Sequence, residues 1–274
     1  MDVPRHELDA DFIAEIAIGT VLLAGGCVGN ALTVHFIRKN HELHAPTFVL
    51  IACLACTDIS ALISRYLFLT FDLVLSYAPD GIINFVVVFG LAALHSSNMH
   101  IVILAHLRYK LIVYPLHTVD VRLRTIYRNS AIAWIVSILV ALCLELPMII
   151  GVDDQVAYII TVCNGFYLLL STLIPILWFH FYKVKALRSS TAIPSGGHDV
   201  TGMMSVMVTL ILTSQVVAIV PLVTASVTMS FIDDIHLRNV LGNTAHCFLL
   251  LNHSINPVLF FYFSKFRRRN IDEV

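Results

Sequence analysis

The sequence predicts an all-α membrane protein, a bundle of seven transmembrane helices. Its 274 residues are 58% hydrophobic and only 13% charged, with a mean hydropathy of +0.85. Soluble domains carry about 25% charged residues, so lipid must be part of this chain's solvent. The apolar residues fall into stretches long enough to cross a hydrocarbon core of about 30 Å. These stretches are 13–37, 46–72, 83–110, 129–151, 159–186, 202–229 and 236–262.

The connections between the stretches are short. GVDDQ (151–155) alone separates the fourth from the fifth, and SSTAIPSGGHD (189–199) is the one linker rich in Ser, Gly and Pro. The segment 1–12 is polar and acidic and lacks the basic region of a cleavable signal peptide, so the first stretch must itself be the anchor. Because the sequence contains no internal repeat and no soluble domain, it predicts a single domain over 1–274.

Lys and Arg gather on one side of the predicted bundle. Every second connection and the C-terminus are basic, whereas the N-terminus and the other connections are acidic. Basic loops stay in the cytoplasm, so we expect a plasma-membrane protein with its N-terminus outside and its C-terminus inside. The helices occupy 13–262. The cytoplasmic segment 263–274 is expected to form a short amphipathic helix along the membrane, with Phe261, Phe263 and Phe266 as lipid anchors.

Four polar side chains fall near the middle of their predicted helices, where polar groups are costly. They are Asp58, Ser97, Asn252 and Asn256. Two interpretations apply. Carboxylate and hydroxyl oxygens are the ligands of hard cations such as Na⁺, so the four would form a cation site. Alternatively, they form a hydrogen-bonded cluster that joins the helices.

Three prolines lie inside predicted helices. Pro175, Pro221 and Pro257 each remove a backbone hydrogen bond and permit a kink. One interpretation is a bend that the membrane tolerates. The other is a hinge at which the sixth and seventh helices bend to open a cytoplasmic cleft, with a ligand biasing two packings of similar energy.

These polar and proline residues, taken in order, resemble those of the rhodopsin-like (class A) G-protein-coupled receptors over essentially the whole chain. The matching residues are Asn30, Leu54, Ala55, Asp58, Arg108, Tyr109, Ile112, Pro115, Leu116, Trp134, Pro175, Pro221, Asn256 and Pro257. The resemblance implies a receptor that binds an extracellular ligand and activates heterotrimeric G proteins. It also implies that the four mid-membrane polar residues form the family's sodium site.

For the third helix, the resemblance implies that Arg108 and Tyr109 meet the G protein in the open state and that Leu116 inserts into it. Alternatively, Arg108 has no signalling role, and its charged side chain only extends to the lipid headgroups on the cytoplasmic side. We expect no catalytic activity, because no nucleophile–base pair or phosphate loop is visible. The expected partners are the lipid bilayer, a heterotrimeric G protein and a small molecule or short peptide, with no nucleic acid.

The chain departs from the family at several positions. Leu107 replaces the acid that precedes the arginine, and loss of that ion pair predicts basal activity. Ile219 stands for the family's Trp before the proline, Phe260 for its tyrosine and Ile83 for its disulfide cysteine. These losses keep open a divergent chemosensory or non-signalling receptor. A transporter is less well supported, because inverted repeats are missing.

The predicted ligand pocket lies in the outer half of the bundle. Gly90 occupies the place where amine receptors carry an aspartate, which disfavours amine ligands. Arg65 would contact an anionic ligand such as a carboxylate, or else pair internally with Glu145 or Asp72. The other residues predicted to line this pocket are Leu94, Tyr167, Ser171 and His246.

Overall fold

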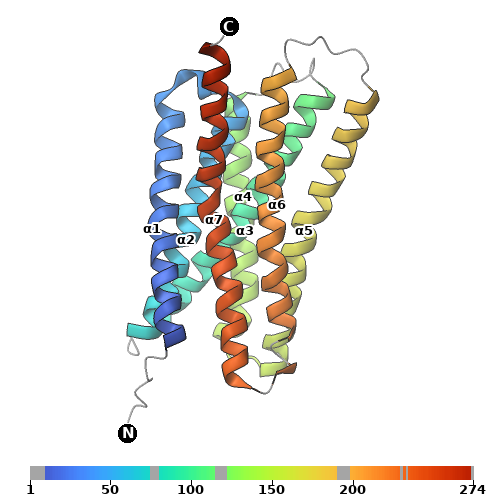
Figure 1. The fold of residues 1–274 in the computed structure, drawn as a ribbon. Coiled ribbons are helices and arrows are strands. Elements are labelled where there is room, and N and C mark those ends of the chain that lie inside the picture. The colour runs from blue at the N-terminus through green and yellow to red at the C-terminus, as the bar shows by residue number, and fades with distance from the viewer. Residues whose placement is uncertain are drawn as a thin grey trace.

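The computed structural model describes residues 10–74, 80–114, 122–189, 198–228, 231–232 and 234–272. Over these ranges the regular structure is entirely helical, with seven long α-helices and a 3-10 turn, η1 (His41–Leu43) (Figure 1). The long helices are α1 (Ala10–Lys39), α2 (Pro46–Val74), α3 (Asp80–Val113), α4 (Leu123–Ile149), α5 (Asp154–Ser189), α6 (His198–Thr228) and α7 (Ile235–Asp272).

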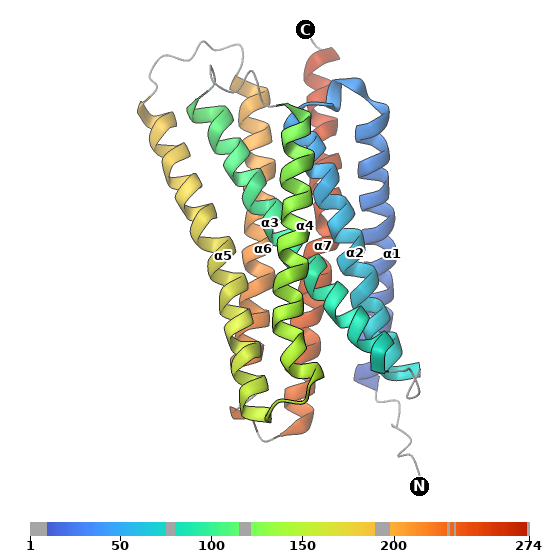
Figure 2. The same ribbon diagram turned by 180° about the vertical axis from the view of Figure 1, so that it is seen from behind.

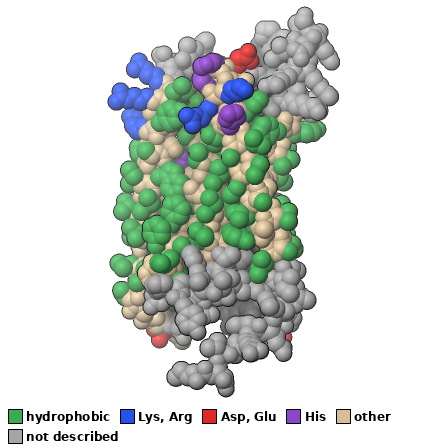
Figure 3. Space-filling model, turned by 90° about the vertical axis from the view of Figure 1, so that its left-hand side faces the viewer, with side chains coloured by type: hydrophobic (Ala, Val, Ile, Leu, Met, Phe, Trp, Pro, Cys, Tyr) green, Lys and Arg blue, Asp and Glu red, His purple; other side chains and the backbone are tan. Residues whose placement is uncertain are grey.

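Six of these helices are long and apolar enough to cross a membrane, judged by length and composition over the described residues. The six candidate spans are Ile16–Lys39, Pro46–Leu67, Gly81–Val113, Leu123–Ile149, Gln155–Ala186 and Val206–Ala225. Figure 3 shows a belt of hydrophobic side chains, with Lys, Arg and His side chains gathered at the end where the C-terminus lies. The chain is therefore a multi-pass α-helical membrane protein.

The predicted break between the fourth and fifth stretches is confirmed. Helix α4 ends at Ile149, and Gly151 then takes a φ of +76°, a left-handed conformation that glycine adopts without a Cβ penalty. The Asp153 side chain accepts a hydrogen bond from the backbone N–H of Gln155 at 2.9 Å, which caps the start of α5. The four residues 150–153 thus suffice to reverse the chain.

The predicted separate membrane-lying helix over 263–274 is wrong. Helix α7 continues without a break to Asp272, and Figure 1 shows it running on toward the C-terminus. The physical reason is local: after Pro257 the sequence contains neither Pro nor Gly to end a helix, and a change from apolar to basic residues does not interrupt the backbone ladder. The side chain of Phe266 lies outside the described part of the chain.

Helix α3 lies at the centre of the bundle. It packs against α2, α4 and α5 and also touches α6, while α7 packs between α1 and α6 (Figures 1 and 2). Helix α4 rests mainly on α3 and hardly touches α5. Because α3 contacts four other helices, its side chains at each level help to define the sites described below.

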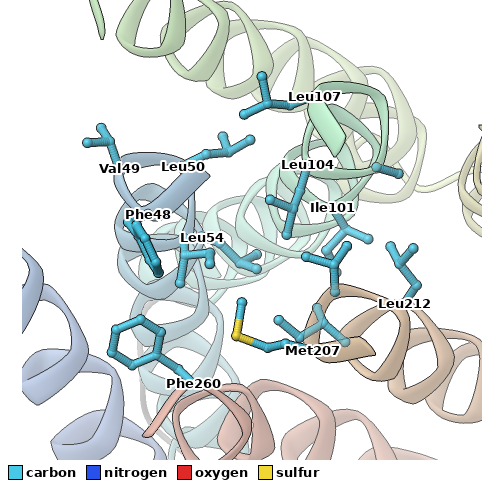
Figure 4. Packing of buried hydrophobic residues seen from close by; sticks show 14 of the residues in the cluster. Phe48, Val49, Leu50, Leu54, Ile101, Leu104, Leu107, Met207, Leu212 and Phe260 are labelled. Atoms are coloured by element: carbon cyan, nitrogen blue, oxygen red, sulfur yellow. The ribbon is translucent and has the colours of Figure 1, made fainter. Parts of the chain in front are cut away.

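Buried apolar side chains fill the half of the bundle nearest the C-terminus (Figure 4). We call them the apolar cluster. Helices α2, α3, α6 and α7 supply its main residues, which include Phe48, Leu50, Leu54, Ile101, Leu104, Leu107, Met207, Ile211, Leu212 and Phe260. Phe260 is 1% exposed, and its ring makes edge contacts with Phe36 and Phe48 at centroid distances of 6.2 and 6.4 Å. Leu107 and Phe260, two of the positions at which the sequence differs from the receptor family that it resembles, thus belong to the same apolar core.

We expect Phe260→Ala to destabilise the fold by about 3 kcal/mol, because it leaves a cavity in a close-packed core. The melting temperature of purified protein in lipid nanodiscs measures this loss. The matched control is Val258→Ala, a truncation of a side chain that is 64% exposed on the same helix. Equal melting temperatures for the two variants would contradict this role for the apolar cluster.

Candidate functional site

The centre of the candidate site is Asp58 on α2, whose side chain is 0% exposed. Oδ1 accepts hydrogen bonds from Ser97 Oγ on α3 and from His253 Nδ1 on α7, both at 2.8 Å. Oδ2 accepts a hydrogen bond from Asn256 Nδ2 on α7 at 2.7 Å. An isolated carboxylate in such a place would be very costly, and charge-assisted hydrogen bonds offset that cost. We call these four residues the Asp58 cluster.

The imidazole of His253 has a defined orientation. Since Nδ1 faces a carboxylate oxygen, it carries the proton and donates it. The backbone carbonyl of His253 accepts a hydrogen bond from Asn30 Nδ2 at 3.0 Å, which ties α1 to α7. Glycines make this approach close: a Cβ on Gly29 would lie 2.9 Å from the Pro257 ring, and one on Gly26 would lie 2.5 Å from Ser254 Oγ. The α1–α7 contact thus fixes the position of His253 along the bundle axis, level with Asp58.

Asn252, the remaining predicted cation ligand, points elsewhere. Its Nδ2 donates to Gln215 Oε1 on α6, and Gln215 Nε2 donates to Asn98 Oδ1 on α3. Gln215 is fully buried and Asn98 nearly so. We call this head-to-tail chain of three amides the amide relay. It joins α7, α6 and α3 in the same part of the bundle as the Asp58 cluster.

The Asp58 cluster fits a bound Na⁺ poorly. Hard cations need several oxygen ligands at close range, but here an N–H of His253 already occupies Oδ1 of the carboxylate. Within the described structure, the side-chain oxygens of Asn252 and Asn256 have no hydrogen-bond partner, so some oxygen ligands do exist on α7. The contacts themselves correspond to the second interpretation made from the sequence, a hydrogen-bonded cluster that joins helices. The sodium site, the first interpretation, is tested by the experiment that closes this subsection.

A cavity of about 380 Å³ lies in the half of the bundle opposite the C-terminus. We call it the outer cavity. Its lining includes three of the residues predicted for a ligand pocket, Arg65, Gly90 and Leu94, together with Glu145. Leu94, Leu168 and Leu249 form a small buried cluster at its wall, from α3, α5 and α7. Gly90 keeps the cavity open beside Ser64, since a Cβ there would lie 3.4 Å from the Ser64 side chain.

His253 also lines the outer cavity. The same residue that donates to Asp58 therefore borders the space in which a ligand would lie. Its Nε2 is buried and has no hydrogen-bond partner among the described atoms. A single side chain thus connects the outer cavity to the Asp58 cluster.

The other predicted pocket residues lie elsewhere. Tyr167 and Ser171 are not in the described lining of the outer cavity; they line a second cavity between α3, α4 and α5. The side chain of His246 and the whole of Leu116 lie outside the described residues. Pro221 lies inside α6, next to Leu222, which lines the outer cavity.

Arg108 is half-buried at the end of α3. Its Nε is buried and has no hydrogen-bond partner in the part of the chain that the structure describes. Tyr109 beside it packs in an aromatic group with Phe179 and Tyr182 of α5, at centroid distances of 5.5 and 6.4 Å. The adjacent Leu107 points into the apolar cluster. Apolar and aromatic packing therefore occupies the place where an acid would pair with the arginine.

The sequence did not predict a role in the site for His253 or for Gln215. A signal for His253 was available, because it lies three residues before Asn256 and so on the same face of α7. His100 was missed as well: its Nδ1 donates to the Ser96 carbonyl at 2.7 Å, and its Nε2 accepts from Ser130 Oγ at 2.7 Å. This second pair fastens α3 to α4.

No family model matches the chain, and no curated protein matches it.

We expect Na⁺ to stabilise a His253→Ser variant and to leave the wild type unchanged. The substitution removes the donor beside Oδ1 and provides a hydroxyl oxygen and space for a cation. Melting temperatures in about 150 mM NaCl and in equimolar choline chloride measure the effect, and we expect the variant to gain about 3 °C. The control is Asp58→Asn combined with His253→Ser, which should gain nothing. Stabilisation of the wild type by Na⁺ would show that the imidazole does not replace the ion.

Proposed function

We propose that the chain is a seven-transmembrane G-protein-coupled receptor of the plasma membrane, with its N-terminus outside. In this proposal it binds a small molecule or short peptide in the outer cavity and activates heterotrimeric G proteins. The single observation that supports it best is the position of His253. One side of this residue lines the outer cavity, and its Nδ1 holds the buried carboxylate of Asp58.

A ligand acts in this scheme by favouring one packing of α7. Contact with His253 changes the position of its ring, and Asp58 and Asn256 must then adjust, because a buried carboxylate cannot lose a donor without cost. Asn256 directly precedes Pro257, where the α7 backbone lacks a hydrogen bond and bends easily. A ligand that binds one packing better shifts the population toward it.

Opening of the cytoplasmic end then requires α6 to leave the apolar cluster. Met207 and Ile211 of α6 belong to the same apolar cluster as Leu107 of α3 and Phe260 of α7. Separation of these side chains exposes apolar surface and the half-buried Arg108, which together form the surface offered to a G protein. Apolar packing serves here as the restraint that an arginine–acid pair supplies in the family.

The ligand chemistry follows from two charged residues of the outer cavity. Arg65 and Glu145 both line it, while most of the other lining residues are apolar. A guanidinium recognises a carboxylate with two parallel hydrogen bonds, and Glu145 accepts from a donor. A compact molecule with a carboxylate and a hydrogen-bond donor suits this pair.

We expect small carboxylates that raise the melting temperature to bind about tenfold to a hundredfold more weakly to Arg65→Gln, because a hydrogen bond to a charged group is lost. The screen uses purified receptor in nanodiscs and a library of small carboxylates, amines and zwitterions. Arg38→Gln is the control, an arginine exposed near the end of α1. Hits that bind both variants equally would place the ligand away from Arg65.

We expect nucleotide exchange on at least one purified G-protein subtype, and a reduction of about tenfold or more in Arg108→Ala. Exchange is measured without ligand and with the best hit of the screen, since the missing acid at Leu107 predicts basal activity. Arg124→Ala, which removes an exposed arginine at the start of α4, is the matched control for loss of charge. Exchange that persists in Arg108→Ala would contradict the role given to this arginine.

A non-signalling receptor of the same fold is the second candidate. The apolar cluster supports it, because no described ion pair at Arg108 has to break for opening and the dry core resists separation of α6. A ligand that stabilises the receptor but produces no exchange on any subtype would favour this candidate.

A further inference from the structure

A second cavity, of about 280 Å³, lies between α3, α4 and α5. We call it the lateral cavity. Helices α4 and α5 hardly touch each other, and both views show them diverging toward the end that holds the C-terminus (Figures 1 and 2). Two of its lining side chains, Ile132 of α4 and Tyr167 of α5, are exposed on the outside of the bundle by 51% and 41%. The lateral cavity therefore opens sideways, toward lipid.

Three polar residues of its lining are buried with an atom that has no partner. They are His95 and Asn98 of α3 and Thr172 of α5, with exposures of 4%, 3% and 1%. Within the described structure, the unpartnered atoms are His95 Nε2, Asn98 Nδ2 and Thr172 Oγ1. A buried polar atom without a partner is costly, and three around a single cavity require a common occupant that satisfies them.

The rest of the lining defines the occupant. No Lys, Arg, Asp or Glu belongs to the described lining, so a charged head would lie there without a counter-ion. Asn98 Nδ2 only donates, so it needs an acceptor oxygen, while the Thr172 hydroxyl both donates and accepts. Val102, Ile103 and Val136 form apolar walls. The His95 ring rests against the Tyr167 ring, with centroids 5.5 Å apart, which fixes the polar end of the cavity.

We propose that the lateral cavity is a second ligand site, entered from the bilayer, for the hydroxyl head of an uncharged amphiphile. The apolar tail of the occupant lies between α4 and α5, and its head meets Thr172, Asn98 and His95. The chemistry is shared by sterols and monoacylglycerols. This site is separate from the outer cavity, and its existence does not depend on coupling to a G protein.

The test uses photolabelling of the full chain in nanodiscs. One probe is a monoacylglycerol with a diazirine in its acyl chain, and a second is a diazirine sterol. Labelled peptides are mapped by mass spectrometry. We expect label on the segments 99–103 and 132–136 from at least one probe. Loss of a single hydrogen bond in Thr172→Val, which keeps the side-chain shape, should reduce that label about fivefold.

Two controls separate a specific site from general contact with lipid. Thr213→Val removes a hydroxyl on the outside of α6 that donates to the Thr209 carbonyl of its own helix, and should leave the labelling unchanged. A monoacylglycerol probe with methylated hydroxyls, which cannot donate, should label these segments more weakly. Ala133→Phe, which fills the cavity at a buried position of α4, should abolish the label.

Three results would overturn the proposal. Equal labelling of Thr172→Val and wild type would show that the polar atoms do not bind the head. Equal labelling by the methylated probe would show that the cavity does not recognise a hydroxyl head. Label from both probes spread evenly over the exposed faces of α1 and α4 would mean that water alone fills the cavity. The melting temperature of each variant confirms that a loss of label is not a loss of fold.

Discussion

The rest of the structure depends on one constraint, the burial of the Asp58 carboxylate in the middle of an apolar bundle. A charge in that position needs donors on several sides, and no single helix can supply them. Ser97 on α3 and His253 and Asn256 on α7 provide them. These hydrogen bonds fix how far α2, α3 and α7 are shifted along the bundle and how each is rotated about its own axis. The Asn30 bond to the His253 carbonyl extends this register to α1.

The bundle is thus divided into layers of different physical character. The Asp58 cluster and the amide relay form a middle layer, with the apolar cluster on the side nearest the C-terminus and the outer cavity on the opposite side. Hydrogen bonds are directional and act over short distances, whereas apolar packing is close but non-directional. The middle layer therefore fixes how the helices are positioned relative to one another, and the apolar cluster determines how much free energy is needed to separate them.

The sequence predicted seven long helices, and each lies where an apolar stretch was expected. Over the described residues, six of the seven are also apolar enough to cross a membrane. The sequence also predicted that Asp58, Ser97 and Asn256 converge, since each sits at mid-depth on its helix. It failed for Tyr167 and Ser171 because depth says nothing about rotation: a turn of α5 about its axis decides which cavity they line. Gln215 and His253 were hidden for the same reason. The end of α7 was mispredicted because a change of polarity was taken for the end of a helix.

The amide relay has a property that single hydrogen bonds lack. Each amide donates in the same direction, from Asn252 to Gln215 to Asn98. One amide cannot rotate alone, because oxygen would then face oxygen and N–H would face N–H, so the three must reverse together. Among the described atoms, the relay therefore ends in an oxygen without a partner on Asn252 and an N–H without a partner on Asn98 at the lateral cavity. The relay therefore has two states. A molecule that offers Asn98 a donor instead of an acceptor would reverse all three amides, so that Asn252 on α7 would present a free N–H instead of a free oxygen.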